Sequence, residues 1–165
     1  FIDTPGAFCG IGAEERGQGE AIARNLLELS RLKTPIISIV LGEGGSGGAL
    51  ALGVCDELAM LENAVYSVIS PRGFASILWK DASREREAAD RLHITAEDLL
   101  KLQVCDAIIE EPTGGAHNNP QQTAENISHY LFGALQKIMR KEVAFLLDSR
   151  YNKFRKIGEF DEGLE

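Results

Sequence analysis

The residues with the clearest chemical potential are five glycines at positions 42, 44, 45, 47 and 48, in the segment GEGGSGG. Glycine inside a helix or strand costs roughly 0.5–1 kcal/mol relative to alanine, so such a cluster needs a reason. A Gly-Gly step at the start of a helix presents N–H groups without intrahelical partners, and the helix dipole favours negative charge there. The backbone could therefore stabilise a developing oxyanion without a catalytic side chain. One glycine would suffice for a tight turn, so five favour a ligand.

The same stretch also fits a dinucleotide-binding fingerprint. Gly42, Gly44 and Gly47 match G-x-G-x-x-G after a predicted strand and before a predicted helix, and Glu62 follows at a suitable distance for a ribose hydroxyl. That fingerprint belongs in the first strand-to-helix turn of its unit, whereas another Pro-Gly loop and helix come first here. Dinucleotide binding is therefore disfavoured, and a Walker loop is excluded because no lysine follows the glycines.

A third interpretation makes Ser46 a nucleophile. Gly44, Ser46 and Gly48 match G-x-S-x-G, the nucleophile elbow of serine hydrolases, and a ClpP-like peptidase is the alternative function. A triad would also need a histidine and an acid. His93 follows a charged helix, His117 lies in a polar loop and His129 lies in a predicted helix. These surroundings indicate surface histidines rather than a catalytic base.

Alternating strands and helices must position these glycines. Strand, Gly/Pro loop and helix succeed one another three times, at DTPGAF, GEGGSGGA and SPRGFA, which predicts a layered α/β domain. No repeat is apparent in the sequence itself. Helices are predicted at 13–32, 48–58, 71–81, 81–92, 94–103 and from Gln121 onward, and strands at 34–41, 59–70 (one or two, with a turn near Asn63) and 105–112.

Composition limits the possible functions. The 165 residues suit one domain, and no apolar run approaches the roughly 20 residues of a membrane span. A net charge of −8 argues against nucleic-acid binding. Residues 137–156 are locally basic, which indicates a solvated helix face or a partner surface.

The three cysteines are odd in number and widely spaced, so neither a disulfide framework nor a metal site is expected. This favours a reducing, cytoplasmic compartment and buried thiols at Cys9, Cys55 and Cys105.

The first residues also carry information. Phe1 and Ile2 form an apolar, strand-like run without an initiating methionine, which predicts that the chain is cut within a domain. Their strand partner is then expected outside these residues or in another chain. Residues 1–165 are interpreted as a single domain that lacks its N-terminal half.

Three segments together resemble the alpha subunits of bacterial acetyl-CoA carboxylase carboxyltransferases: FIDTPGAFCGIGAEERGQGEAIARNL, GEGGSGGALALG and YSVISPRGFASILWKD. GGAHNNP and the long C-terminal helix fit the same family, so the resemblance covers essentially the whole chain. It implies the crotonase (ClpP-like) fold of repeated ββα units, with a long C-terminal helical segment.

The resemblance also implies a reaction and partners. In this family a carboxyl group passes from carboxybiotin on the biotin carboxyl carrier protein to acetyl-CoA, giving malonyl-CoA for fatty acid biosynthesis. The alpha subunit pairs with a zinc-carrying beta subunit in an α2β2 assembly, beside biotin carboxylase, which belongs to the ATP-binding holo-complex. No cofactor is then bound covalently by this chain, and the freed biotin acts as the base.

Individual roles follow from the same resemblance. Gly47 and Gly48 correspond to a backbone oxyanion hole for the biotin ureido oxygen. Gly6 and Ala7, in the Pro-Gly-Ala segment, are implied to line the same pocket, as are Gly44, Gly45 and Ser46. The chain departs from the family pattern at Cys9-Gly10, where Pro-Gly is common, and at Arg72, where an acid is usual. Neither change touches the Gly47–Gly48 step.

Overall fold

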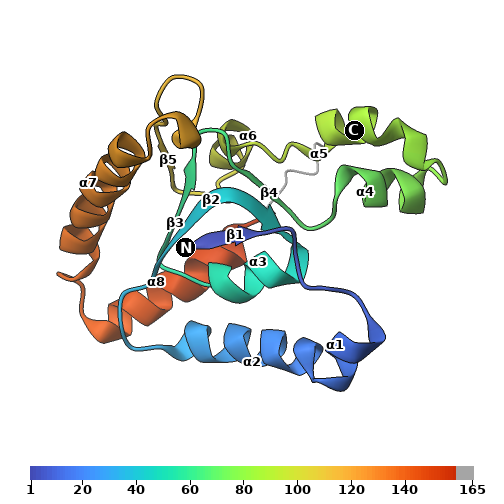
Figure 1. Ribbon diagram of the computed structural model, residues 1–165. Coiled ribbons are helices and arrows are strands. Elements are labelled where there is room, and N and C mark those ends of the chain that lie inside the picture. Colours follow the sequence, from blue (N-terminus) through green and yellow to red (C-terminus); the bar gives the residue numbers. More distant parts are fainter. Residues whose placement is uncertain (159–165) are drawn as a thin grey trace, which may run out of the picture.

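The computed structural model describes residues 1–158, in which five parallel strands form one sheet (Figure 1). Its order is β1-β2-β3-β5, and β4 pairs with β2. The strands are β1 (Ile2–Thr4), β2 (Ile37–Gly45), β3 (Glu57–Leu61), β4 (Val65–Ser67) and β5 (Ala107–Ile109). The layered α/β class predicted from the alternation is confirmed.

Strand β2 is the centre of the sheet. Strand β1 pairs with it from Val40 to Gly44, β3 with its first half and β4 with residues 43–45. Because β1 occupies one edge of β2, β3 and β4 follow one another along the other edge. The expectation that the first residues pair outside this chain is wrong, since β2 itself supplies the partner of Ile2.

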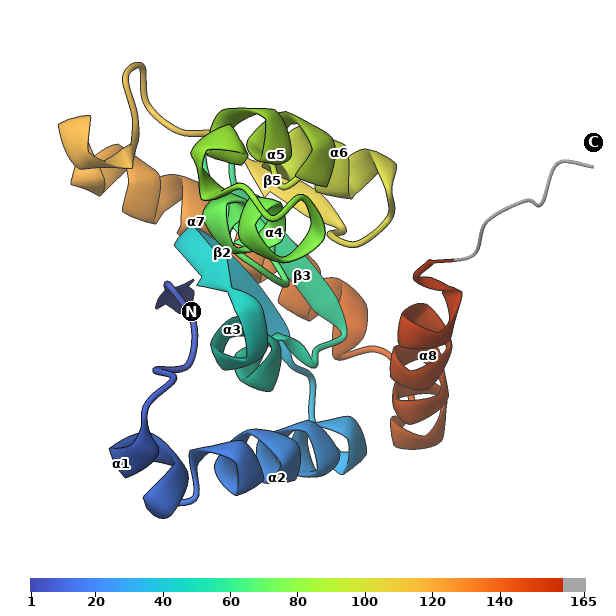
Figure 2. The same ribbon diagram turned by 90° about the vertical axis from the view of Figure 1, so that its right-hand side faces the viewer.

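The helices surround this sheet on several sides. Helix α3 packs between the sheet and α2, α7 and α8 lie on the side of β3 and β5, and α4 and α5 stand away from the sheet (Figures 1 and 2). The helices are α1 (Ile11–Glu15), α2 (Gln18–Arg31), α3 (Ser46–Gly53), α4 (Pro71–Leu78), α5 (Glu85–Leu92), α6 (Ala96–Lys101), α7 (Pro120–Ile138) and α8 (Val143–Lys156), with 3-10 turns at Ala82–Arg84 and Ala116–Asn118.

The structure differs from the predicted elements at several boundaries, of which three bear on the site. The helix predicted at 13–32 is broken at Gly17, whose φ of 76° is left-handed, and so forms α1 and α2. The predicted glycine loop does not exist, because β2 continues through Gly45 and α3 begins at Ser46. The helix predicted at 48–58 ends at Gly53, since Glu57 already pairs with Ile37 in the sheet.

The neighbouring strands β3 and β5 are preceded by the same three residues. Val-Cys-Asp precedes β3 at 54–56 and β5 at 104–106. In each copy the cysteine is buried. Each aspartate exchanges two hydrogen bonds with the backbone of one other residue: Asp56 with Ile36, just before β2, and Asp106 with Leu58 of β3. The same tripeptide therefore makes the same backbone contacts at the start of both strands.

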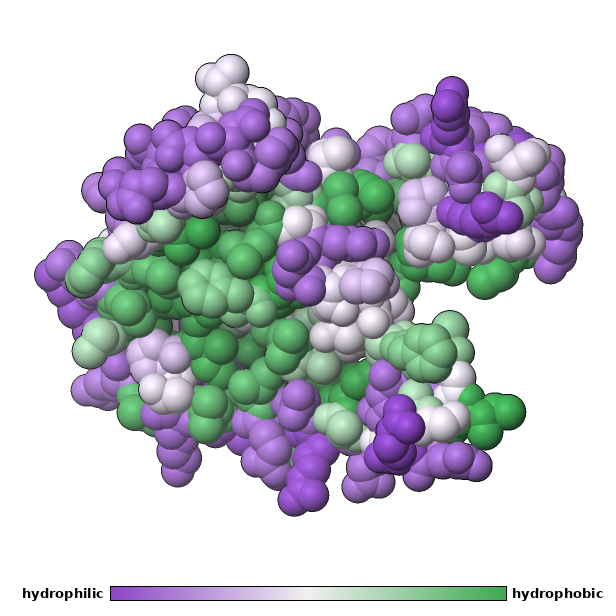
Figure 3. Space-filling view, in the orientation of Figure 1, coloured by the Kyte–Doolittle hydropathy of each residue, from purple (hydrophilic) through white to green (hydrophobic). Residues whose placement is uncertain are grey.

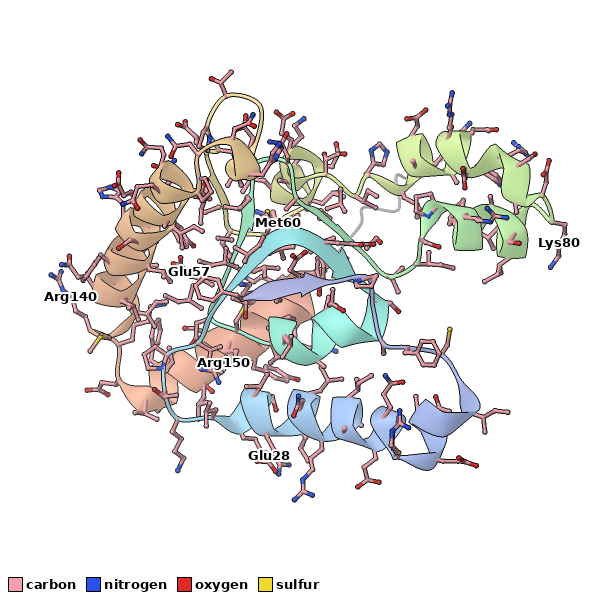
Figure 4. The ribbon with its side chains drawn as sticks, in the orientation of Figure 1. Glu28, Glu57, Met60, Lys80, Arg140 and Arg150 are labelled. Carbon is pink, nitrogen blue, oxygen red and sulfur yellow. The ribbon has the colours of Figure 1, made fainter. Side chains whose placement is uncertain are left out.

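Helix α8 is tied to both copies of this tripeptide. Arg150 is 2% exposed and extends from α8 toward α2 and the sheet (Figure 4). Its guanidinium pairs with Asp56 at 2.8 Å and donates to the carbonyls of Leu29, Leu32 and Thr34 at the end of α2. One turn later, Lys153 pairs with Asp106. The C-terminal helix is therefore fixed to the sheet by two ion pairs.

The cysteines differ in their surroundings. Cys55 and Cys105 are buried as expected, and burial raises the pKa of both thiols. Cys9 is exposed, so the prediction of a third buried thiol is wrong; it belongs to the segment between β1 and α1 rather than to the core. From residue 1 to residue 158, no helix combines the length and apolar character that a membrane span requires.

Candidate functional site

The chain turns sharply from β2 into α3 at the glycine cluster. Gly45 is extended at φ −94°, and Ser46, the first helical residue, has the left-handed φ of 50°. Gly45 offers no side chain to cap the helix. Among the backbone hydrogen bonds outside the helices and ladders of the described residues, none has the N–H of Gly47 or Gly48 as its donor. These groups are therefore available to an external oxygen, as the start of a helix requires.

The Pro5–Ala7 segment packs directly on this turn. A Cβ on Gly48 would lie 2.8 Å from the amide nitrogen of Ala7 and 2.9 Å from the carbonyl carbon of Gly6, and one on Gly45 would overlap the Pro5 carbonyl. Gly6 itself has a φ of 125°. Close backbone packing thus explains why positions 45 and 48 are glycine.

Two more glycines are explained in the same way. A Cβ on Gly44 would lie 2.5 Å from Cδ2 of Tyr66, and one on Gly42 would lie 2.9 Å from Oδ1 of Asp3. Gly47 differs, because its Cβ would meet only Cδ1 of Ile22, at an ordinary 3.6 Å. The expectation that packing needs only one glycine is therefore wrong, since four of the five have a packing partner.

A pocket of about 440 Å³ opens at the start of α3. Ser46, Gly47 and Leu50 form one side, and the end of β4 forms another through Tyr66, Ser67 and Val68. The remaining wall is apolar and comes from Leu92, Ile94, Leu99 and Val104. No charged side chain lines this pocket, and the polar side chains among its lining residues are those of Ser46, Ser67 and Tyr66.

The predicted site residues cluster in space but play different parts in the structure. Ser46 and Gly47 line the pocket, whereas Gly44 and Gly45 are buried. Gly48 contacts Gly6 and Ala7 beside the pocket lining. The structure brings all seven residues to one turn, and their roles stay predictions.

Sequence reasoning missed Tyr66 and the apolar wall. Burial raises the pKa of the Tyr66 phenol, which keeps it neutral at ordinary pH. Tyr66 stands on β4 opposite Gly44 of β2, and only that pairing shows its place at the site. The wall residues come from α5, α6 and the segments that follow these helices. In the sequence they alternate with polar residues on short helices, a pattern that indicates only helices packed against the core.

The geometry does not support the hydrolase interpretation. The left-handed Ser46 resembles a nucleophile elbow in its backbone, but no histidine or carboxylate lines the pocket with it. His93 is exposed and lies 3.8 Å from Asp98. His117 belongs to the loop after β5 and His129 to α7. The structure therefore provides no base for the Ser46 hydroxyl in the part of the chain that it describes.

Apolar side chains are exposed on both sides of the pocket. Phe8 is 72% and Ile11 80% exposed on the segment that leads into α1, and Val68 is 80% exposed after β4. Ile77 and Leu78 of α4 are also exposed. Figure 3 shows a notch between the α4–α5 pair and the region of α1, with apolar residues along its upper side. Such unpaired apolar surface is typical of a protein-binding region.

Known proteins match this chain along nearly its whole length. The family described as "Acetyl co-enzyme A carboxylase carboxyltransferase-like" matches residues 1–158. A relative from Clostridium botulinum (strain Eklund 17B / Type B), named acetyl-coenzyme A carboxylase carboxyl transferase subunit alpha, is 62% identical over 161 residues. The match covers 98% of this chain and 59% of the relative, so the chain spans little more than half the relative's length.

Solved structures with the same fold are more distant in sequence. A Pseudomonas malonate decarboxylase hetero-tetramer in complex with coenzyme A superposes with a TM-score of 0.73 at 18% identity, over 93% of this chain and 62% of that one. Transcarboxylase 12S, a hexamer with hydrolysed methylmalonyl-coenzyme A, gives a TM-score of 0.68 at 22% identity, over 86% and 26%. These structures confirm the predicted crotonase fold.

Proposed function

The chain belongs to the acetyl-CoA carboxylase carboxyltransferase family, and we propose that it supplies the alpha-subunit side of that active site. The reaction moves a carboxyl group from carboxybiotin, carried by the biotin carboxyl carrier protein, to acetyl-CoA, giving malonyl-CoA. The observation that carries this assignment is the uncapped start of α3 beside an apolar pocket. We place the reaction in the cytoplasm, where acetyl-CoA and the carrier would meet the subunit.

The main-chain N–H groups do the chemical work assigned to this chain. The N–H groups of Gly47 and Gly48 hold the ureido oxygen of biotin and stabilise negative charge on it, aided by the dipole of α3. Because backbone contacts hold the turn, these donors need no rearrangement when charge develops. No carboxylate, histidine or lysine lines the pocket, which fits a reaction whose base is the substrate itself.

The apolar wall would exclude water from the same place once a partner subunit covers the pocket. Four aliphatic side chains face the start of α3, so an oxygen bound there interacts with the N–H groups in a medium of low dielectric. Ser46 lies at the turn as a small residue that leaves room for a flat ring. The turn is held in place by its neighbours Gly44 and Gly45 and by the packed Pro5–Ala7 segment, which includes Gly6 and Ala7. This segment therefore contributes to binding by fixing the turn.

The site is expected to be completed by a second subunit. The exposed Phe8, Ile11, Val68, Ile77 and Leu78 would be covered by a zinc-carrying beta subunit in an α2β2 assembly. Biotin carboxylase would recharge the carrier. This arrangement predicts that acetyl-CoA is held mainly by the partner, so this chain alone lacks activity.

The first experiment is malonyl-CoA-dependent carboxylation of biotin, the reverse reaction, with and without a beta subunit from a clostridial relative. We expect turnover only with both subunits. Labelling of Ser46 by a fluorophosphonate, with loss of activity in Ser46→Ala, would instead establish a hydrolase and overturn the proposal.

The second experiment removes a single N–H group without adding a side chain. Replacing residue 47 or 48 by glycolic acid converts its amide to an ester, and we expect kcat to fall by about 10²–10³ at either position. Gly19 supplies the matched control, because it is also a second helical residue with no acceptor for its N–H among the described residues. An ester at 47 or 48 that behaves like the ester at 19 would disprove the backbone donor role.

A further inference from the structure

Tyr66 fills the space between the sheet and both ends of α3. Its Cδ2 atom lies 2.5 Å and its Cε2 atom 3.4 Å from the position of a Cβ on Gly44, just before the helix. Its hydroxyl oxygen lies 3.2 Å from the position of a Cβ on Gly53, the last helical residue. The ring therefore occupies the volume that two side chains would need.

The backbone of Tyr66 is fixed on two sides. Residue 66 pairs with Gly44 in the β2–β4 ladder, and its N–H donates to the carbonyl of Ile94 at 3.0 Å. A ring on so constrained a backbone has little freedom to follow movements of α3. The helix must instead adapt to the ring.

The ring also lines the pocket, next to Ser46 and Gly47. We propose that Tyr66 is a positioning residue whose ring sets the height of α3 above the sheet and so aims the first-turn N–H groups at the bound oxygen. This inference rests on the proposed function, because it takes Gly47 and Gly48 as the donors. Tyr66 acts through the helix, and its phenol takes no proton in the reaction.

The kinetic test compares Tyr66→Phe with Tyr66→Val in the complex with a beta subunit. Tyr66→Phe keeps the ring and is expected to leave kcat within about threefold of wild type. Tyr66→Val removes the ring while keeping a strand-forming residue, and kcat is expected to fall at least about tenfold, because small displacements of reacting groups are costly. KM for malonyl-CoA should not change, since the partner holds that substrate.

A structural role alone would give a different pattern. Tyr151→Val, at an exposed position of α8, is the matched control and should leave kcat unchanged. The proposal is overturned if Tyr66→Val keeps wild-type kcat, or if its loss of rate only follows the fraction unfolded at the assay temperature.

A second-site test uses the glycine that touches the ring. Gly44→Ala places a methyl group against Tyr66 and is expected to lower kcat at least about tenfold. In the Tyr66→Val background the same change should cost less than about threefold, because the 2.5 Å contact with the ring is removed and only Val40 Cγ1, at 3.3 Å, remains close. Gly133→Ala, which meets no atom within 4 Å, controls for the glycine substitution itself. Equal losses in the two backgrounds would overturn the proposal.

A spectroscopic measurement separates this inference from the proposed function. Amide ¹H–¹⁵N signals of Gly47 and Gly48 should move in Tyr66→Val and stay in place in Tyr66→Phe. This readout needs no turnover. If the wild-type complex is inactive, the carboxyltransferase assignment fails while the positioning role is still judged by these signals; if the complex is active and the signals do not move, only the positioning role fails.

Discussion

Gly47 and Gly48 are adjacent glycines in the same helical turn, yet substitution by alanine should affect them in opposite directions. In Gly48→Ala the new methyl group would lie 2.8 Å from the nitrogen of Ala7 and 2.9 Å from the carbonyl carbon of Gly6. Both neighbours are backbone atoms, so they cannot rotate away. In Gly47→Ala the methyl group would meet only Ile22, at 3.6 Å.

The magnitudes follow from these contacts. Overpacking against a fixed backbone costs about 1–3 kcal/mol, so Gly48→Ala should destabilise the fold by roughly that amount. Alanine is favoured over glycine in a helix by about 1 kcal/mol, so Gly47→Ala should leave the free energy of unfolding unchanged or raise it by up to that amount. The two variants should then differ in melting temperature by several degrees, at roughly 2–4 °C for each kcal/mol.

Urea unfolding followed by circular dichroism measures both changes. Gly45→Ala extends the series, because its methyl group would overlap the Pro5 carbonyl, and it should be the least stable of the three variants. Equal stability of Gly47→Ala and Gly48→Ala would refute the packing argument. A destabilised Gly47→Ala would show that position 47 is also constrained by contacts within the fold.

Two further predictions concern the rest of the fold. Arg150→Met leaves a buried carboxylate without its partner and should destabilise the fold by about 3–5 kcal/mol, whereas the exposed Arg140→Met should change stability by less than about 0.5 kcal/mol; comparable urea midpoints for the two variants would contradict the assignment. Iodoacetamide at pH 8 should modify the exposed Cys9 in the native protein and reach the other two thiols only after unfolding, because burial raises their pKa and blocks access; mass spectrometry showing native labelling of Cys55 or Cys105 would count against their burial.

Local patterns were sufficient to predict most elements. The β-branched run at 36–40 indicates a strand, and Thr95 with Asp98 indicates a helix start, which the structure confirms through a 3.3 Å bond from the Asp98 N–H to the Thr95 hydroxyl. Boundaries failed where tertiary pairing overrides local preference. Gly44 and Gly45 read as loop residues, yet β4 pairs with both and extends the strand to the helix.

The candidate site could be predicted only in part, for a physical reason. The donors that we propose for it are backbone N–H groups, and glycines indicate their place in the sequence. Most of these positions need glycine because residues distant in sequence occupy the space that a side chain would fill: Asp3, Pro5, Ala7 and Tyr66. Likewise Arg150 reads as one more cation on a basic helix, and its burial depends on carbonyls more than 110 residues away.

The packing of the glycines bears directly on how the turn could work. A glycine-rich loop in solvent would sample many conformations, and its N–H groups would have to be ordered at each turnover. Here the bare faces of Gly45 and Gly48 are pressed against Pro5–Ala7, and that of Gly44 against Tyr66, so the entropy of ordering is lost on folding. Donors held in this way stabilise charge without reorganising, which is the condition under which backbone N–H groups are most effective. In the role that we propose for this turn, the glycines are therefore required less to admit a ligand than to let the neighbouring backbone pack closely and fix the N–H groups in place.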